Sequence, residues 1–340
     1  MFNRIIVNEL VKWANKKNRK PLVLRGARQV GKTTVVNQFA KNFEQYIYLN
    51  LELPNDSKPF QNFSNIEDLV QTLFFIKDKE YGKRNKTLLF IDEIQEIPEA
   101  FNVLRYFYEE MPEIHVIAAG SLLETIFNNK LKFPVGRVEF LMLRPVSFLE
   151  FLGAMGEIQA IEQFNTVPLK SFAHDKLLNL FHTYALIGGM PEIVNSYSEA
   201  KDITAIGSIY DSLIASYLDD VEKYAHNNSQ VQVIRHVIKT SYFEASKRIK
   251  FQGFGKSRYG SKEVGEALRT LEKTFLLSLV YPTTSAKLPI LPELQKSPRL
   301  HLLDTGLMNY MAGIQKEIIG TDDLNTIYHG AVIEHLVGQE

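Results

Sequence analysis

The sequence predicts an α/β fold in its first 145 residues, followed by a helical region and then a smaller module that mixes helices and strands. Two observations support this prediction. Short apolar runs such as "PLVLR", "YIYLNLE" and "TLLFID" alternate with stretches of helical spacing, which is typical of βαβ units and a parallel sheet covered on both faces. After about residue 146 the strand signals stop, and they return only in "LLSLVYPTTSAKLPILPELQKSPRLHLLD".

The elements follow in order along the chain. Residues 4–17 have the apolar spacing of an amphipathic helix that ends in the basic stretch "NKKNRK". Further helices are predicted at 32–43, from about residue 66 and at 98–110, with the strand "IHVIAAG" after the last of these. Residues 146–225 read as helices, broken by "IGGMPE". The two glycines and the proline of "GGMP" mark a turn to which we assign no chemistry.

Composition excludes several classes of protein. The 340 residues are 45% hydrophobic and 23% charged, as in ordinary folded domains, and 39 basic residues balance 39 acidic ones. Any binding of nucleic acid must therefore come from a local patch. The absence of cysteine excludes disulfides and thiol catalysis. No apolar run is long enough for a signal sequence or a membrane span, so we expect a cytoplasmic protein without a membrane partner.

A phosphate-binding loop is the clearest functional motif. The stretch "GARQVGKTT" contains the pattern G-x-x-x-x-G-K-[ST] between a predicted strand and a predicted helix. Glycines permit positive φ angles, and the backbone N–H groups and the helix N-terminus converge on a point that suits a polyphosphate. Lys32 would contact the β- and γ-phosphates, and Thr33 would coordinate Mg²⁺. The residues expected to contact the nucleotide are Gly26, Ala27, Arg28, Gln29, Val30, Gly31, Lys32, Thr33 and Thr34.

Two adjacent carboxylates complete the predicted site. In "TLLFIDE" an apolar run brings Asp92 and Glu93 to the carboxyl end of a buried strand, where ligands bind in open α/β sheets. Asp92 would hold Mg²⁺ through water, and Glu93 would orient and deprotonate the attacking water. Because two carboxylates beside a triphosphate repel it, a cation is expected between them.

The loop and the carboxylates together predict a P-loop NTPase. We expect it to bind a nucleoside triphosphate with Mg²⁺ and to hydrolyse it. A small-molecule kinase is the weaker alternative, since the adjacent Asp and Glu favour water as the phosphoryl acceptor.

The stretches "LRGARQVGKTT", "LLFIDEIQEIPE", "VIAAGSLL", "FPVGRVEFLMLRPVSFLEFL" and "IGGMPE", in this order, closely resemble a family of prokaryotic AAA-superfamily ATPases with a C-terminal domain of uncharacterised function. The resemblance covers nearly the whole chain. It implies an AAA-type core, a helical lid and ATP as the nucleotide.

The resemblance also implies roles for single residues. Ser121 would occupy the sensor-1 position and contact the γ-phosphate or the water, although Asn or Thr is more usual there; the alternative is that Ser121 caps the helix "SLLETIF". Arg137 matches a candidate arginine finger, with Arg144 as a rival, and such a finger would stabilise the transition state. It would act on its own or on a neighbour's nucleotide. The alternative for each arginine is a surface ion pair.

The expected domains are an N-terminal helix (1–19), an AAA-type P-loop core (20–145), a helical lid (146–225), a winged-helix-like module (226–315) and the start of an incomplete domain (316–340). In relatives the last region continues into a nuclease-like fold. Glu334 alone cannot form a metal site, so we predict no nuclease activity.

A basic stretch inside the module suggests a partner. Six basic residues and no acid lie between residues 247 and 262, ahead of a helix that in a winged helix often enters the DNA major groove. Glu263, Glu266 and Glu272 on that helix oppose DNA binding, so a solvated or protein-facing surface remains the alternative. The basic residues are Lys247, Arg248, Lys250, Lys256, Arg258 and Lys262.

Two functions follow from these patterns. The first is an ATPase that couples hydrolysis to a conformational change of the C-terminal module, with double-stranded DNA, a protein or further copies of the chain as partner. The second is a DNA-binding or scaffold protein that uses ATP as a switch and turns over hardly at all.

Overall fold

The computed structural model describes residues 2–121, 136–225, 227–285, 287–315 and 331–339. The chain forms two compact units. The N-terminal unit contains residues 4–144, and the C-terminal unit contains residues 145–340 together with residues 1–3. The helix predicted at 32–43 ends at Phe39 and continues as a short 3₁₀ turn, and "SLLETIF" lies outside the described residues beyond its first serine.

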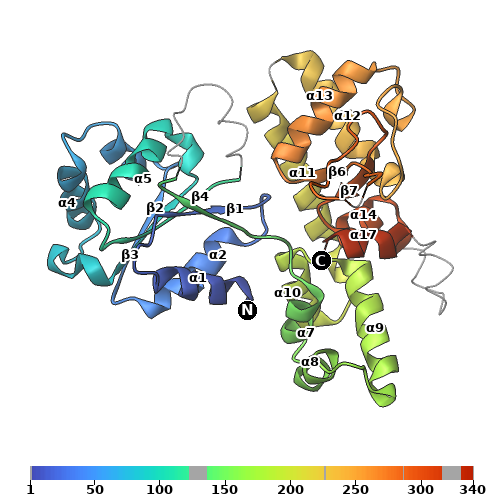
Figure 1. Cartoon of the computed structure of the whole chain (residues 1–340), viewed down its shortest axis with the longest axis horizontal. Coiled ribbons are helices and arrows are strands. Elements are labelled where there is room, and N and C mark those ends of the chain that lie inside the picture. The colour runs from blue at the N-terminus through green and yellow to red at the C-terminus, as the bar shows by residue number, and fades with distance from the viewer. Residues whose placement is uncertain (1, 122–135, 226, 286, 316–330, 340) are drawn as a thin grey trace. The chain divides into compact units, whose positions relative to one another are not determined.

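The N-terminal unit is built on a five-stranded sheet in which every pairing is parallel (Figure 1). The strand order is β2-β3-β4-β1-β5, so β4 lies between β1 and β3 although it follows both in the sequence. This confirms the predicted α/β fold with a parallel sheet. The strands are β1 (Leu22–Arg25), β2 (Gln45–Asn50), β3 (Thr87–Asp92), β4 (His115–Ala119) and β5 (Glu139–Met142).

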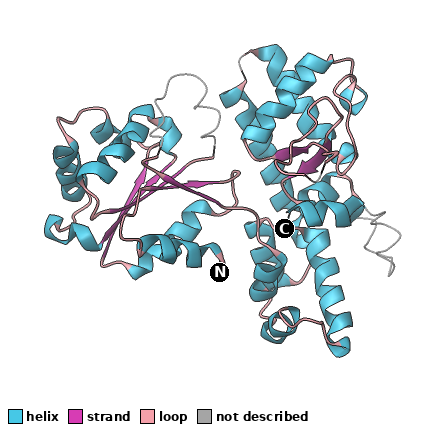
Figure 2. Cartoon of the chain, viewed as in Figure 1, coloured by secondary structure: helices cyan, strands magenta, loops and turns pink. Residues whose placement is uncertain are grey.

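Helices cover both faces of this sheet, with α1 and α2 on one face and α4 and α5 on the other (Figures 1 and 2). In α4 the side chain of Asn65 caps the first turn, and the apolar face packs on the sheet. Pro98 begins α5, where its fixed φ suits the first turn. The helices are α1 (Ile6–Ala14), α2 (Lys32–Phe39), α3 (Pro54–Ser57), α4 (Ile66–Ile76) and α5 (Pro98–Glu110), with short 3₁₀ helices η1 (Ala40–Asn42), η2 (Lys58–Phe60), η3 (Tyr81–Lys86) and η4 (Ile94–Glu96).

The C-terminal unit begins with the helices expected for residues 146–225. A capping box formed by Ser147 and Glu150 begins the first of them. None of the helices in the described part of the chain is long and apolar enough to cross a membrane. The helices are α7 (Phe148–Ala154), α8 (Ile158–Phe164), α9 (Ser171–Ile187), α10 (Pro191–Ala200) and α11 (Gly207–Tyr224), with η5 (Thr204–Ile206) before the last.

A smaller module of helices and strands completes this unit. Its strands β6 and β7 pair antiparallel and are joined by a long loop. The backbone just after α12 adds a short third edge, because the N–H of Ile249 donates to Pro298 and that of Leu300 donates to Lys247. The elements are α12 (Asn228–Glu244), η6 (Phe254–Lys256), α13 (Ser261–Lys273), β6 (Leu277–Val280), β7 (Arg299–Leu302), α14 (Thr305–Met311) and α17 (Ala331–Gln339).

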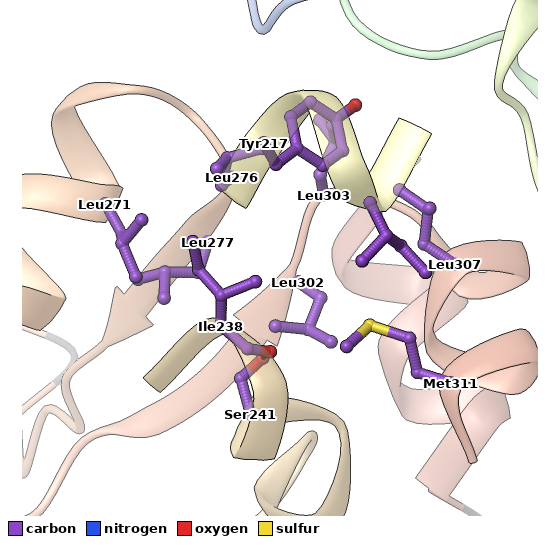
Figure 3. Close-up of a pocket in the computed structure, with 11 residues that line it drawn as sticks. Tyr217, Ile238, Ser241, Leu271, Leu276, Leu277, Leu302, Leu303, Leu307 and Met311 are labelled. Carbon is purple, nitrogen blue, oxygen red and sulfur yellow. Dashed lines mark hydrogen bonds between the residues drawn. The ribbon is translucent and has the colours of Figure 1, made fainter. Parts of the chain in front are cut away.

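A small apolar cavity of about 50 Å³ lies in the core of the module (Figure 3). The hydroxyl of Ser241, which lines it, already donates to the carbonyl of Ile238 at 3.0 Å. The cavity is thus close to the size of a single small apolar molecule and offers little to orient one. Other residues that line it include Tyr217, Leu271, Leu277, Leu302, Leu307 and Met311.

Asp304 ties the helical segment to this module. Its carboxylate is fully buried and accepts the backbone N–H of Gly189 at 2.5 Å and that of Leu307 at 3.0 Å. Burial raises the pKa of Asp304 to about 6. Gly188, in the turn between α9 and α10, has a φ of +69°, and a β-carbon there would lie 2.3 Å from the carboxylate. Both the conformation and the close approach require glycine.

We expect Gly188→Ala to lower the free energy of unfolding of the C-terminal unit by about 3 kcal/mol or more, since the new methyl group displaces a buried carboxylate. Gly156→Ala is the matched control, because Gly156 also has a positive φ (+75°) but nothing within 4 Å of the added carbon. Gly156→Ala should lower the free energy of unfolding by only about 1–2 kcal/mol, which is the cost of holding alanine in the left-handed conformation. Thermal unfolding of the two variants gives the comparison, and equal destabilisation would contradict the close approach.

Candidate active site

The phosphate loop joins β1 to α2 at the carboxyl edge of the sheet. Gly26 and Gly31 have φ angles of +151° and +91°, and Gln29 between them is also left-handed, with φ +63°. A β-carbon on Gly26 would lie 2.3 Å from the carbonyl oxygen of Leu143, just beyond β5. The guanidinium of Arg4 donates to the carbonyl of Val30 at 3.2 Å and to that of Arg144, the residue after Leu143, at 2.7 Å. Arg4 and the backbone of residues 143–144 therefore hold the loop in a conformation that needs its glycines.

Lys32, the first residue of α2, points back into the loop. Its ammonium donates to the carbonyl of Gly26 at 3.0 Å and to that of Ala27 at 2.8 Å, and the side chain is only 7% exposed. Burial lowers the pKa of Lys32 to about 8, although nearby Glu93 and Asp92 oppose this shift. A buried ammonium at a helix N-terminus is arranged to meet an anion. Among the remaining loop residues Ala27 and Val30 are buried, Arg28 is half-buried, and Gln29 and Thr34 are exposed.

The structure brings Thr33 against Asp92, which is far from it in the sequence. The hydroxyl of Thr33 donates to Asp92 Oδ2 at 2.6 Å, and the backbone N–H of Glu93 donates to Asp92 Oδ1 at 3.1 Å. Burial raises the pKa of Asp92, and the hydrogen bond from Thr33 opposes the shift. Thr33, Asp92 and Glu93 thus meet beside the ammonium of Lys32 at one edge of the sheet.

These residues fit a magnesium ion. A hydroxyl and a carboxylate oxygen lie 2.6 Å apart, and both are hard oxygen ligands of the kind that Mg²⁺ prefers. The described residues contain no group of three or more His, Cys, Asp or Glu that could hold a metal by themselves. Water and phosphate oxygens would have to supply the other ligands of such an ion. Bound there, the ion would neutralise charge on the β- and γ-phosphate oxygens.

The three further predicted residues have different surroundings. Ser121 is 7% exposed and follows β4, so the strand order places it at the edge between the phosphate loop and the carboxylates. The guanidinium of Arg137 instead forms an ion pair with Glu109 on α5. The side chain of Arg144 is exposed, and its backbone carbonyl accepts from Arg4 at 2.7 Å.

Two residues of the site escaped the sequence analysis. The hydroxyl of Tyr48 on β2 donates to Asp92 Oδ2 at 3.4 Å, and burial together with Asp92 raises the pKa of Tyr48 to about 12. The side-chain amide of Gln95 donates to the carboxylate of Glu93. The position of Gln95 in "DEIQ" was a visible signal, whereas that of Tyr48 depends on the pairing of β2 with β3.

The basic stretch lies in the C-terminal unit and runs from just after α12 into the first turn of α13. All six of its side chains are exposed, and none of them forms an ion pair with another described residue. Of the three opposing acids, Glu263 accepts the N–H of Gly260 at 2.8 Å and Glu272 accepts that of Leu279 at 2.9 Å. Two of the three carboxylates are therefore engaged in local structure.

The strand order, with the loop after β1 and the carboxylates after β3, defines a P-loop NTPase fold. Residues 18–152 match a family model described as an AAA domain, and residues 178–318 match one described as a domain of unknown function. The AAA-domain match thus covers most of the N-terminal unit, whose fold is that of a P-loop NTPase. For the C-terminal region the winged-helix and nuclease-like expectations stay predictions.

A solved Walker-type ATPase of Pyrococcus abyssi is similar over 92% of this chain and 96% of its own, with a TM-score of 0.57 and 13% identity. This likeness shows the fold alone. Two further solved structures are more distant. DnaA of Aquifex aeolicus with bound AMPPCP is 13% identical, with a TM-score of 0.33, and the match covers 79% of this chain and 86% of that one. A signal transduction ATPase with numerous domains from Pyrococcus horikoshii is 13% identical, with a TM-score of 0.38, and the match covers 98% of this chain and 44% of that one. No curated protein matches the sequence.

The lowered pKa of Lys32, about 8 without ligand, predicts proton uptake on nucleotide binding. A triphosphate stabilises the ammonium and raises this pKa, so between about pH 8 and pH 10 a neutral lysine must gain a proton, and affinity falls as the pH rises. Calorimetric titration with Mg·ATP in buffers of different ionisation enthalpy measures the uptake. In Lys32→Arg the cation stays charged, and equal uptake in this variant would exclude Lys32 as the proton acceptor.

Proposed function

We propose that the protein binds ATP with Mg²⁺ at the loop of residues 26–34 and hydrolyses it. The observation that carries this proposal is the meeting of Thr33 and Asp92 at 2.6 Å beside the buried ammonium of Lys32. Lys32 would bind the β- and γ-phosphates, and Thr33 and Asp92 would hold the metal. An exposed phosphate-binding turn without chemistry would not need a lysine and a carboxylate that are both buried.

We propose that the carboxylate of Glu93 acts as the general base. It follows Asp92 directly, and its φ of +51° turns the backbone at the end of β3. In the proposed step a water oxygen forms a bond to the γ-phosphorus while a water proton passes to Glu93. The bond from phosphorus to the bridging oxygen breaks, and its electron pair leaves with the nucleoside diphosphate. Lys32 stabilises the charge that develops on the leaving phosphate.

Phosphate release from Mg·ATP by the wild type and by Lys32→Ala is the first test. Glu93→Gln should then lower kcat about 100-fold or more while nucleotide affinity is kept, because glutamine has the shape of glutamate but cannot act as the general base. Glu96→Gln is the matched control, since Glu96 lies in the same turn with an exposed side chain.

Unchanged turnover in Glu93→Gln would remove this residue from the mechanism. Tight binding without turnover in the wild type would favour the ATP-switched protein over the ATPase. Transfer of phosphate to a metabolite, with no free phosphate released, would indicate a kinase.

The proposal extends to the C-terminal module, which we interpret as a winged helix that contacts double-stranded DNA. In support, α13 is followed by the β6-β7 hairpin, and residues 246–249 pair with the edge of β7, the elements of a winged helix in their usual order. The six exposed basic residues between 247 and 262 would meet phosphates, which gives salt-dependent binding with little sequence preference. Nucleotide hydrolysis would alter this contact.

Charge reversal tests the DNA contact. Lys250→Glu combined with Arg258→Glu should weaken binding to a DNA duplex about tenfold or more at low salt and reduce the slope of log affinity against log salt by about 2, since two phosphate contacts are lost. Lys170 is an exposed lysine of the same unit outside the stretch, and Lys170→Glu should leave the affinity and the salt slope unchanged. Fluorescence anisotropy measures the binding. Equal effects of the two changes would indicate that the basic stretch is a solvated surface and not a DNA contact.

A further inference from the structure

Gln95 has one half of its side-chain amide engaged and the other half without a partner. It lies in η4, two residues after Glu93, and is 9% exposed. Its Nε2 group donates to Oε2 of Glu93. Its Oε1 atom is buried and has no hydrogen-bond partner among the residues that the structure describes.

This orientation of the amide follows from the charge of its neighbour. The opposite orientation would place Oε1 against a carboxylate oxygen, with two acceptors in contact and no proton between them. The Gln95 carbonyl is therefore fixed beside the carboxylate of Glu93. A buried acceptor without a donor is unfavourable. Because Oε1 is closed to solvent in the structure, a donor would reach it only when the neighbouring side chains shift, and it would then stabilise the site.

The donor must suit both acceptors at once. Water carries two O–H groups, and its lone pairs stay free when both protons are donated. A water that donates one proton to Glu93 and the other to Gln95 Oε1 would present a lone pair away from both. That is the orientation required of a nucleophile attacking phosphorus while Glu93 takes its proton.

We propose that Gln95 is a water-positioning residue of the hydrolytic site, with two tasks: its amide N–H holds the carboxylate of Glu93, and its carbonyl accepts a hydrogen bond from the attacking water. The inference rests on the proposed ATP hydrolysis. No proton passes to Gln95, since the amide only orients the water, and the proton that leaves goes to Glu93.

Gln95→Met tests the inference, because methionine keeps the volume and removes both hydrogen bonds. The expected result in steady-state phosphate release is a kcat lowered about 100-fold, with KM and nucleotide affinity within about twofold, since the hydrogen bond of Gln95 goes to Glu93 and not to the loop or the proposed metal ligands. A merely structural role would instead lower the melting temperature and weaken nucleotide binding.

The chain offers a matched control in Gln163 on α8. Its Oε1 atom is also buried without a partner among the described residues, but it lies in the C-terminal unit. Gln163→Met should leave kcat unchanged. In the Glu93→Gln background, Gln95→Met should have little further effect, because a water that no base activates gains little from being oriented.

Gln95→Glu covers the case in which the methionine variant does not fold. It keeps the size and polarity of the side chain but sets a second carboxylate against Glu93, so kcat should again fall about 100-fold. Wild-type kcat in either folded variant, or a higher kcat, would overturn the inference. A wild type that releases no more phosphate than Lys32→Ala would instead overturn the proposed hydrolysis itself.

Discussion

A buried ammonium at the carboxyl edge of a parallel sheet is the feature on which the N-terminal unit depends. Lys32 can remain there only because two loop carbonyls and two nearby carboxylates compensate for the water it has lost. The loop keeps its shape because Gly26 packs against the backbone beyond β5 and Arg4 joins Val30 to the same segment. Elements from both ends of the unit thus converge on one charge.

Much of this arrangement could be predicted because its signals are local. The glycines and lysine of the loop, the apolar run before Asp92 and the proline that begins α5 each specify their own element. The helix predicted at 98–110 is observed as α5 over the same residues. The helices predicted at 4–17 and 32–43 end earlier than expected. The spacing of apolar residues indicates which face of a helix is buried, but it does not specify the residue at which the helix ends.

The contacts that complete the site could not be predicted in the same way. The position of β4 between β1 and β3, which sets the place of Ser121, depends on packing between distant segments. Tyr48 reaches Asp92 only because β2 pairs with β3 in one register. The hydrogen bond from Gln95 to Glu93 spans a left-handed turn at Glu93 that no glycine signals. A side-chain ion pair such as that of Arg137 with Glu109 leaves no pattern in the sequence.

The carboxylate of Asp304 bears on how segments could be exchanged between related chains. Because it accepts an N–H from the turn before α10 and another at the start of α14, a graft that moved only residues 226–315 would separate this buried acceptor from one of its donors. A chimaera cut within the turn after Arg144 would carry both donors along. The natural joint for recombination is therefore at the boundary of the two units, and the helices of residues 146–225 travel with the module.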